Sequence, residues 1–473
     1  MVRKKFQGVG FVALMLVVVA LGCTKKSLEP SLKQNLEEDA LSAVVELQAA
    51  LDGAYDFMSD YHYYGRDYII YNEVRSDNCL STGNSNRFSN FWNRLLSTDR
   101  YASDTWLAMY KVIGQCNYVI SKADVSLEGP AELQSSIVGQ AYALRALVHF
   151  DLLKLYGGVH VNGQQEKGVP YVTKWSKEES TPARTDVEAF RQQLYADLDQ
   201  AVERIPSDAP IDRAYVGYYA AHALKARVAQ WFGDWSTAEQ EAKVVIESKK
   251  FSILNADEFL QSWEKKFNKN SLFEISNNAS DNQSIDGIAN IYGGDAYGDV
   301  VPTPELVELL QKDPNDVRSK LVGENEALKK ETKGEIGYYW ANMVKYPDLT
   351  SYSDNIPLIR IEEVVLIYAE ALMHNGNSAE ALNQLNSIAT KRNAAPYTEA
   401  TEETIMLERR KELCFEGFRF DDLSRAHLGV LPSKATALDL LKRSYEYGSV
   451  DYSFPIPKGE LNANPSLHQN LGY

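Results

Sequence analysis

The chain has 473 residues, of which 44% are hydrophobic and 24% charged, and its formal net charge at pH 7 is -16. A chain of this length can bury a large core, as one large domain or as two or three smaller ones. The acidic balance argues against nucleic acid as a partner, because a phosphate backbone requires a basic surface.

Residues 1–22 have the pattern of a secretory signal peptide. Three basic side chains lie among the first five residues, and an unbroken apolar run over 11–21 leads directly to Gly22 and Cys23. The run is too short to cross a hydrocarbon layer of about 30 Å. A cysteine directly after the cut indicates a bacterial lipoprotein, with acyl chains on Cys23 that anchor it to a bilayer. The alternative is a plain secreted protein with an incidental cysteine.

The next part of the chain is predicted to be helical. Residues 23–39 comprise the lipidated cysteine and a polar tether, and residues 40–250 form an N-terminal helical region. Apolar side chains recur at helical spacing from Ala43 onward. Further helices are predicted over 103–124, 132–156, 186–204, 213–232 and 235–249.

Residues 251–360 interrupt the helical pattern. They are rich in Asn, Asp, Gly, Ser and Tyr, and they contain turn signals such as Tyr292-Gly-Gly-Asp295. This segment is predicted to be a loop-rich, ligand-binding insertion with short strands. The C-terminal region, residues 361–473, is helical again and ends in a tail. Its helices are predicted over 361–375, 378–392, 402–417 and 435–443.

Two predicted helix pairs look like copies of each other. Ala226, Gly233, Ala238 and Ala242 correspond to Ala369, Gly376, Ala381 and Leu385 at a constant offset of 143. Small residues let two helices approach closely, and glycine supplies a left-handed turn between them. The pattern predicts a mainly helical, all-α fold with tetratricopeptide-like helix pairs as its scaffold. Two unrelated helical hairpins are the alternative.

Longer motifs lie near the C-terminus and recur in order along the whole mature chain. The most specific are Pro357-Leu-Ile-Arg-Ile-Glu-Glu-Val-Val-Leu-Ile-Tyr-Ala-Glu-Ala371, Glu408-Arg-Arg-Lys-Glu-Leu-Cys-Phe-Glu-Gly-Phe-Arg-Phe-Asp-Asp-Leu-Ser-Arg425 and the tail from Phe454 to Tyr473. Earlier ones are Ala50–Tyr55, Glu73–Asp77, Gly139–Ala146 and Leu155–Gly158. With these motifs the chain resembles the SusD/RagB family of Bacteroidetes nutrient-binding lipoproteins.

The resemblance implies more than the residues show by themselves. It implies a lipid anchor in the outer membrane, an orientation toward the cell exterior, and a role as lid and partner of a SusC-like TonB-dependent transporter. It also implies a glycan or peptide nutrient as the ligand and no cofactor. Lys25 and Lys26 depart from the pattern, because surface-exported lipoproteins of such organisms usually carry acidic residues there.

A carboxylate-rich helix is the strongest catalytic candidate in the sequence. Glu408, Glu412 and Glu416 share one helix face at i, i+4 spacing. An internal ion-pair network is the favoured interpretation over a general acid/base pair, with cations from Arg409, Arg410, Lys411 and Arg419. Glu362 and Glu363 are neighbours that point to different faces. No nucleophile elbow or metalloprotease motif occurs. Residues 281–287 faintly resemble a calcium loop, but Gln283 and Ile285 stand where oxygen ligands would alternate. No catalytic or metal-binding residue is therefore predicted, and a surface-anchored glycoside hydrolase is the alternative.

Aromatic residues in polar stretches are the candidate ligand-binding residues. Sugars stack their C–H faces on aromatic rings, while amide, carboxylate and guanidinium groups bind the hydroxyls. Three stretches supply both kinds of group, and they favour a glycan over a peptide. Ordinary packing is the alternative for each ring. The candidates are Asn90, Trp92, Arg94, Tyr292, Tyr297 and Trp340.

Overall fold

The computed structural model of the protein describes residues 41–82, 87–92, 96–97, 101–164, 167–176, 178, 180–293, 295–331, 340–431 and 446–473. Five predictions lie outside the described residues. They concern the signal peptide, the lipidated Cys23, the tether up to residue 39, Arg94 and the helix over 435–443.

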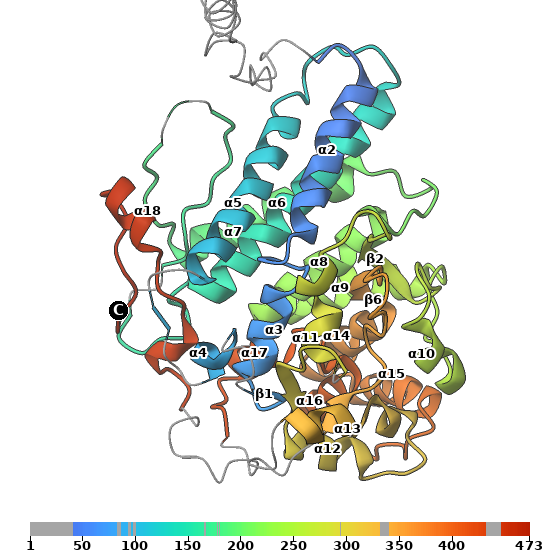
Figure 1. The fold of residues 1–473 in the computed structure, drawn as a ribbon. Coiled ribbons are helices and arrows are strands. Elements are labelled where there is room, and N and C mark those ends of the chain that lie inside the picture. The colour runs from blue at the N-terminus through green and yellow to red at the C-terminus, as the bar shows by residue number, and fades with distance from the viewer. Residues whose placement is uncertain are drawn as a thin grey trace, which may run out of the picture. The chain divides into compact units, whose positions relative to one another are not determined.

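A linear array of helices organises residues 44–473 (Figure 1). Each helix of the array packs against the next, including α9 against α14 across the insertion between them. The array confirms the mainly helical fold. Its members are α2 (Val44–Ser59), α5 (Tyr101–Ile120), α6 (Ala131–Tyr156), α7 (Val187–Arg204), α8 (Tyr218–Trp231), α9 (Trp235–Glu247), α14 (Ile361–His374) and α15 (Ser378–Lys391).

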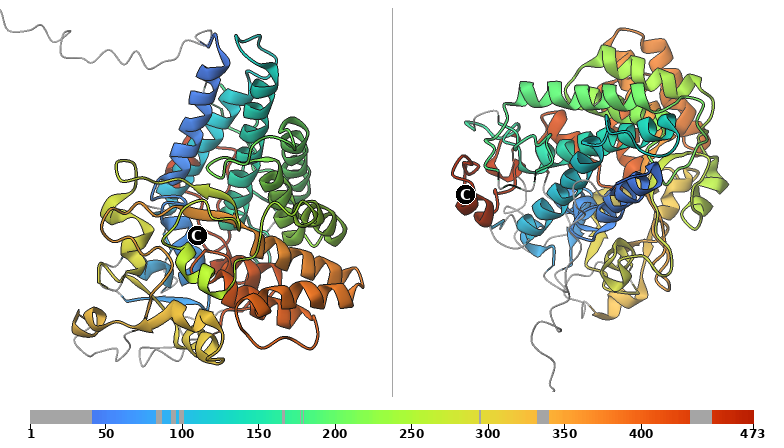
Figure 2. Two further views of the ribbon diagram at one scale, coloured as in Figure 1. Left: turned by 90° about the vertical axis from the view of Figure 1, so that its right-hand side faces the viewer. Right: turned by 90° about the horizontal axis from the view of Figure 1, so that it is seen from above.

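The two predicted repeats are the pairs α8–α9 and α14–α15 (Figure 2). All of the alanines in the repeat pattern are fully buried, so the paired helices approach closely. Gly233 and Gly376 have φ angles of 69° and 86°, the left-handed conformation that each turn requires. Trp235 stacks on His374 with ring centroids 3.9 Å apart, which joins the pairs to each other. The tetratricopeptide-like arrangement is confirmed.

The insertion begins and ends side by side. Strand β2 (Ser271–Ile275) pairs antiparallel with β6 (Ile356–Arg360), so the chain leaves the array and returns to it at one place. Two more antiparallel pairs lie in or beside the insertion, β1 (Cys79–Ser81) with β3 (Val300–Pro302) and β4 (Val322–Glu324) with β5 (Trp340–Asn342). The short strands were predicted. The insertion also contains short helices that were not, namely α10 (Ala256–Ser262), α11 (Ile288–Tyr292), α12 (Pro304–Gln311) and α13 (Glu326–Glu331).

The remaining helices differ from the predicted ones in instructive ways. Helix α16 (Glu402–Leu413) ends before residue 417, because Phe415 and Gly417 both have left-handed φ angles, of 68° and 82°. Helix α3 (Asp67–Val74) was not predicted, because all of its residues are buried and none marks a solvent face. The others are α4 (Ser89–Trp92), α17 (Arg419–Arg425) and α18 (Lys458–Ala463).

Within the described part of the chain, no helix has both the length and the apolar composition that a membrane span requires.

Candidate functional site

The three stretches predicted to bind ligand meet around one small apolar cluster. The cluster contains Trp92 from α4 and Ala341 from β5. The Tyr292–Tyr297 stretch leads into β3, which contributes Val301. Pairing of β1 with β3 places Leu80 opposite Val301, and pairing of β4 with β5 places Trp340 opposite Glu324. Segments far apart in the sequence therefore meet at one buried cluster. The cluster consists of Leu80, Trp92, Val301, Leu328 and Ala341.

Trp340 presents its ring away from this cluster. Ala341 is fully buried inside the cluster, and successive residues of a strand face opposite sides, so the Trp340 indole lies on the other face of β5. The side chain is half-buried. Among the described residues, the Trp340 indole has no stacking partner and no hydrogen-bond acceptor. A ring in this state can offer a flat apolar face to a ligand.

Tyr297 lies in a tight turn beside charged groups. The guanidinium of Arg87 lies 4.5 Å from the centre of the half-buried Tyr297 ring. Arg87 also pairs with Asp286 at 3.3 Å, and the Asp286 side chain is 49% exposed. The turn needs glycine at the next position, since Gly298 has a φ of 54° and a Cβ there would lie 2.6 Å from Leu328. An exposed carboxylate and a guanidinium beside an aromatic ring suit the hydroxyls of a sugar.

Two of the predicted rings lie in the core. Trp92 is 7% exposed and belongs to the apolar cluster, and Tyr292 is 1% exposed and donates its hydroxyl to the Phe415 carbonyl oxygen at 3.3 Å. A buried ring cannot stack on a ligand unless its surroundings move. We therefore assign Trp92 and Tyr292 to packing, while Asn90 is exposed on α4 beside the same surface.

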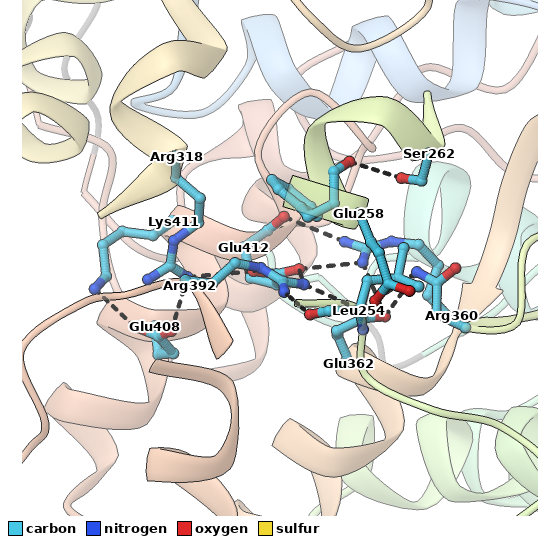
Figure 3. A network of polar contacts seen from close by, with 12 residues as sticks. Leu254, Glu258, Ser262, Arg318, Arg360, Glu362, Arg392, Glu408, Lys411 and Glu412 are labelled. Carbon is cyan, nitrogen blue, oxygen red and sulfur yellow. Dashed lines mark hydrogen bonds and ion pairs between the residues drawn. The ribbon is translucent and has the colours of Figure 1, made fainter. Parts of the chain in front are cut away.

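The carboxylates of α16 belong to a buried ion-pair network (Figure 3). Arg318 contacts Glu408 at 2.7 Å, and Arg392 contacts Glu412 at 2.7 Å. Glu416 follows the helix and is held by two cations from other segments, Arg360 at 2.8 Å and Lys345 at 2.5 Å. These contacts tie α16 to the insertion and to the end of α15.

Most of the cations in this network are not the predicted ones. Lys411 does contact Glu408, at 2.7 Å. Arg409 instead pairs with Asp422 at 3.0 Å, and Arg419 pairs with Asp77 at 2.7 Å. Neighbours in the sequence were poor guides, because the helix turns their side chains to other faces. Arg410 likewise contacts Asp77, at 3.3 Å.

The electrostatics of the network oppose acid/base chemistry. Burial alone would raise the pKa of Glu408, but Arg318 and Lys411 hold it below its ordinary value. Arg392 and Arg360 overcome burial in the same way and lower the pKa of Glu412 strongly. A general acid must hold a proton near neutral pH, whereas these groups are held ionised. Glu362 and Glu363 have separate partners, Arg392 and Arg227, as expected of side chains on different faces.

Several side chains that contribute to these contacts were not predicted from the sequence. Arg87 was not singled out, although it lies one residue before the aromatic stretch that begins at Phe88. Arg318 and Arg392 carried no motif at all, because only the packing of distant segments brings them to α16. In the described residues, no group of three or more His, Cys, Asp or Glu side chains is placed to hold a metal ion.

Two family models match different parts of the chain. The model described as the SusD family matches residues 323–473. The model described as "Starch-binding associating with outer membrane" matches residues 28–229. Together they take in the helical array on both sides of the insertion except for α9 and the last residues of α8.

Individual proteins show the same likeness. The chain is 26% identical to "SusD-like protein P2" of Formosa agariphila over 99% of both chains. It is 30% identical to "Starch-binding protein SusD" of Bacteroides thetaiotaomicron over 27% of this chain and 22% of that one. A crystal structure of a SusD superfamily protein from Bacteroides thetaiotaomicron superposes with a TM-score of 0.82, at 27% identity, over 90% of this chain and 99% of that chain.

Proposed function

The chain belongs to the SusD/RagB family, and on this premise we propose that it is a lipid-anchored outer-membrane protein that binds a nutrient without catalysis. Cys23 carries the lipid, and the body faces the cell exterior. The bound nutrient passes to a SusC-like TonB-dependent transporter, because a lipoprotein has no route of its own across a bilayer. The helical array supplies a broad surface for that partner.

The ligand is a glycan, bound at the surface around Tyr297 and Trp340. The observation that carries this assignment is the half-buried Trp340 indole, which has no ring partner among the described residues. Arg87 lies beside Tyr297 and pairs with Asp286, and both charged groups can bind sugar hydroxyls. The family model that matches the N-terminal half is described as starch-binding, which favours the same ligand class.

Calorimetry on the full-length chain in mild detergent tests the site. The probes are soluble starch, laminarin and a mixture of short peptides. Trp340→Ala should weaken binding of whichever glycan the parent binds by about 1–3 kcal/mol, the usual scale for an aromatic anchor. The unfolding midpoint should not move. Trp235→Ala is the control, since that indole stacks on His374 in the helical array.

Two outcomes would contradict the assignment. Binding of peptides alone would replace the glycan by the peptide alternative within the same family. Release of product from a glycan, lost on replacing a carboxylate of the insertion, would make the protein an anchored glycoside hydrolase.

Purification from the native membrane tests the anchor and the partner. The protein should co-purify with a large β-barrel under several mild detergents. Cys23→Ala should release it from the membrane fraction. Recovery of the parent alone under all of these conditions would count against the transporter role.

A further inference from the structure

An open hollow of about 240 Å³ lies between α2, the segment that precedes α8 and the segment that follows β2. Its volume is close to the lower end of the range of roughly 300–1,000 Å³ that is typical of small-molecule sites, so it suits a ligand of about one sugar ring. None of its lining residues belongs to the surface around Tyr297 and Trp340. The residues that matter below are Asp52, Tyr55, Asp56, Tyr215 and Asp281.

Three carboxylates line the hollow, and none of them pairs with a cation in the described part of the chain. Asp52 accepts from Gln48 Nε2 at 2.8 Å and from the Tyr215 hydroxyl at 3.1 Å, both at Oδ1, so its Oδ2 is left for another donor. The exposed side chains of Asp56 and Asp281 accept no hydrogen bond from the described residues. No lysine, arginine or histidine lines the hollow among those residues. Donors to these oxygens therefore come from solvent or from a ligand.

The placement of Asp52 and Asp56 is unfavourable for α2 itself. They lie at i, i+4, where two like charges destabilise a helix. Asp56 also lies in the last turn, at the negative end of the helix dipole, and that turn contains no basic residue. Within the described part of the protein, no cation offsets either effect. Local rules of this kind are typically broken at functional sites, and a positively charged ligand would relieve both effects.

A single metal ion does not fit the hollow. Asp281 begins the segment that faintly resembles a calcium loop, but the carboxylates of the described residues are not placed to hold one ion together. Negative charge that is distributed over a hollow of this size suits a larger cation, and it disfavours an anionic ligand.

A fixed aromatic ring lies beside the carboxylates. Tyr215 is half-buried, and its ring packs edge to face on Tyr55 with centroids 5.0 Å apart. Its hydroxyl bond to Asp52 holds it in place. An immobilised ring next to carboxylate acceptors suits the C–H face and the hydroxyl groups of a sugar. With the uncompensated charge, the lining favours a sugar that carries an amine.

We propose that this hollow is a second ligand site, which binds one positively charged amino-sugar residue. The ammonium group is attracted by Asp56 and Asp281, a hydroxyl group donates to Asp52 Oδ2, and the C–H face of the ring lies against Tyr215. The site goes beyond the proposed function and uses none of its residues. It can be occupied whether or not a polysaccharide binds at Trp340.

D-glucosamine and N-acetyl-D-glucosamine are the probes, because acetylation removes the positive charge and keeps the sugar ring. Each is titrated into the full-length chain in mild detergent at about pH 5.5, where aspartates are ionised, and binding is followed by ligand-observed NMR. We expect glucosamine to bind the parent severalfold more tightly than its acetylated form. The preference should shrink at high salt, because exposed charges are screened.

Asp56→Asn tests the carboxylate while keeping its shape. The variant should bind glucosamine about two- to fivefold more weakly, the scale of an exposed ion pair. Binding of N-acetylglucosamine should not change. The unfolding midpoint should stay the same or rise, because the repulsion between Asp56 and Asp52 is removed.

Asp257→Asn is the matched control. Asp257 is also an exposed carboxylate on a helix, in the first turn of α10, and it lies outside the hollow. The control removes the same charge from the protein and should bind glucosamine as the parent does. Equal weakening in both variants would overturn the proposal, since it would show that the net charge attracts the ligand.

Three further results would overturn the proposal. These are no binding of glucosamine, equal or tighter binding of N-acetylglucosamine, and binding of L-lysine amide as tight as that of glucosamine, which would show that the sugar ring contributes nothing. Trp340→Ala separates this site from the proposed function, because it should leave glucosamine binding unchanged. Loss of glucosamine binding in Trp340→Ala would place the amino sugar at the surface of the proposed function instead.

Discussion

At the residue scale, the pKa of a buried carboxylate depends on whether a cation or a neutral hydrogen-bond donor faces it. Burial raises the pKa of Glu73 to about 7, although hydrogen bonds from Asn78 and the Gly417 backbone oppose the rise. Burial would also raise the pKa of Asp77, but Arg419 and Arg410 lower it to about 2. Glu73 and Asp77 belong to one motif and lie four residues apart, yet they respond to pH in opposite directions.

Glu73 should make the protein less stable as the pH rises. Its pKa in the folded protein lies above its ordinary value of 4.5, so the folded state binds more protons between these two values. The free energy of unfolding contributed by this group therefore falls from about pH 4.5 to 7 and is constant above. Glu73→Gln should remove this slope. In urea unfolding, the free energy of unfolding of the parent minus that of the variant should therefore fall by up to about 3 kcal/mol between pH 5 and 8.

The slope is the readout in that experiment, since a constant offset from altered hydrogen bonds is expected too. Glu402→Gln, at the exposed start of α16, is the control and should leave the slope as it is in the parent. A parallel pH dependence in the parent and in Glu73→Gln would show that Glu73 is ionised throughout.

Trp92 and Trp340 should separate stability from binding. Trp92→Ala empties part of the cluster around Leu328 and should lower the free energy of unfolding by about 3–5 kcal/mol. Trp340→Ala should leave it nearly unchanged, because that ring is half-buried and points away from the cluster. Thermal and urea unfolding of both variants measure this. An unaltered midpoint for Trp92→Ala would reopen its prediction as a ligand-binding residue.

At the element scale, left-handed glycines set where helices end. Gly376 follows the end of α14 and has open space where a Cβ would lie. Alanine there would be penalised only by its unfavourable left-handed backbone conformation, not by a steric clash. Gly417 follows α16 and lies against the neighbouring helix α3, where a Cβ would come within 2.9 Å of the Ile69 Cα. The two positions share a backbone conformation and differ in packing.

Alanine should therefore have unequal effects at these two turns. Gly376→Ala should lower the free energy of unfolding by about 1–2 kcal/mol, the penalty of a left-handed residue with a side chain. Gly417→Ala should lower it by more than that, since backbone atoms of α3 must also move. Urea unfolding of both variants tests the difference. Equal losses of stability would mean that the backbone of α3 can move away from a side chain at position 417 at little energetic cost.

At the scale of the whole molecule, the C-terminal tail is tied to the helical array. Asn470 donates to the backbone carbonyl oxygens of Tyr156 at 2.8 Å and Phe454 at 2.7 Å. It accepts from Arg184 Nη1 at 2.7 Å, and Arg184 is itself buried. One amide thus joins the end of α6, the segment after it and the tail.

Asn470→Ala should loosen the tail from the array. The change leaves Arg184 and two carbonyl groups without this partner, at about 1–3 kcal/mol for each unsatisfied buried group. Hydrogen exchange should show earlier opening of residues 454–473 than in the parent. Leu471→Ala is the control, because that side chain is 49% exposed. Unchanged exchange in the tail would show that the other contacts hold it without Asn470.

Local patterns were sufficient for the helical array and for the family resemblance. Long amphipathic helices repeat their apolar residues over several turns, and the two repeats add glycine at matched positions, so both are visible in the sequence by itself. The helices of the insertion and α3 were missed. Most of them are too short for a readable period, or are buried on all sides. Helix α12 is the exception, because Thr303 caps it and Leu306, Val307 and Leu310 recur on one buried face.

The site depended on tertiary structure. The sequence by itself determined that aromatic and polar residues gather in three stretches, and that the α16 carboxylates need cations. Only the fold decided that Trp92 and Tyr292 lie in the core while Trp340 is half-buried, and that the cations come from Arg318, Arg360, Arg392 and Lys345. The physical reason is that burial and charge pairing depend on which distant segments meet. Local sequence specifies the elements, but contacts between segments far apart in the chain specify their partners.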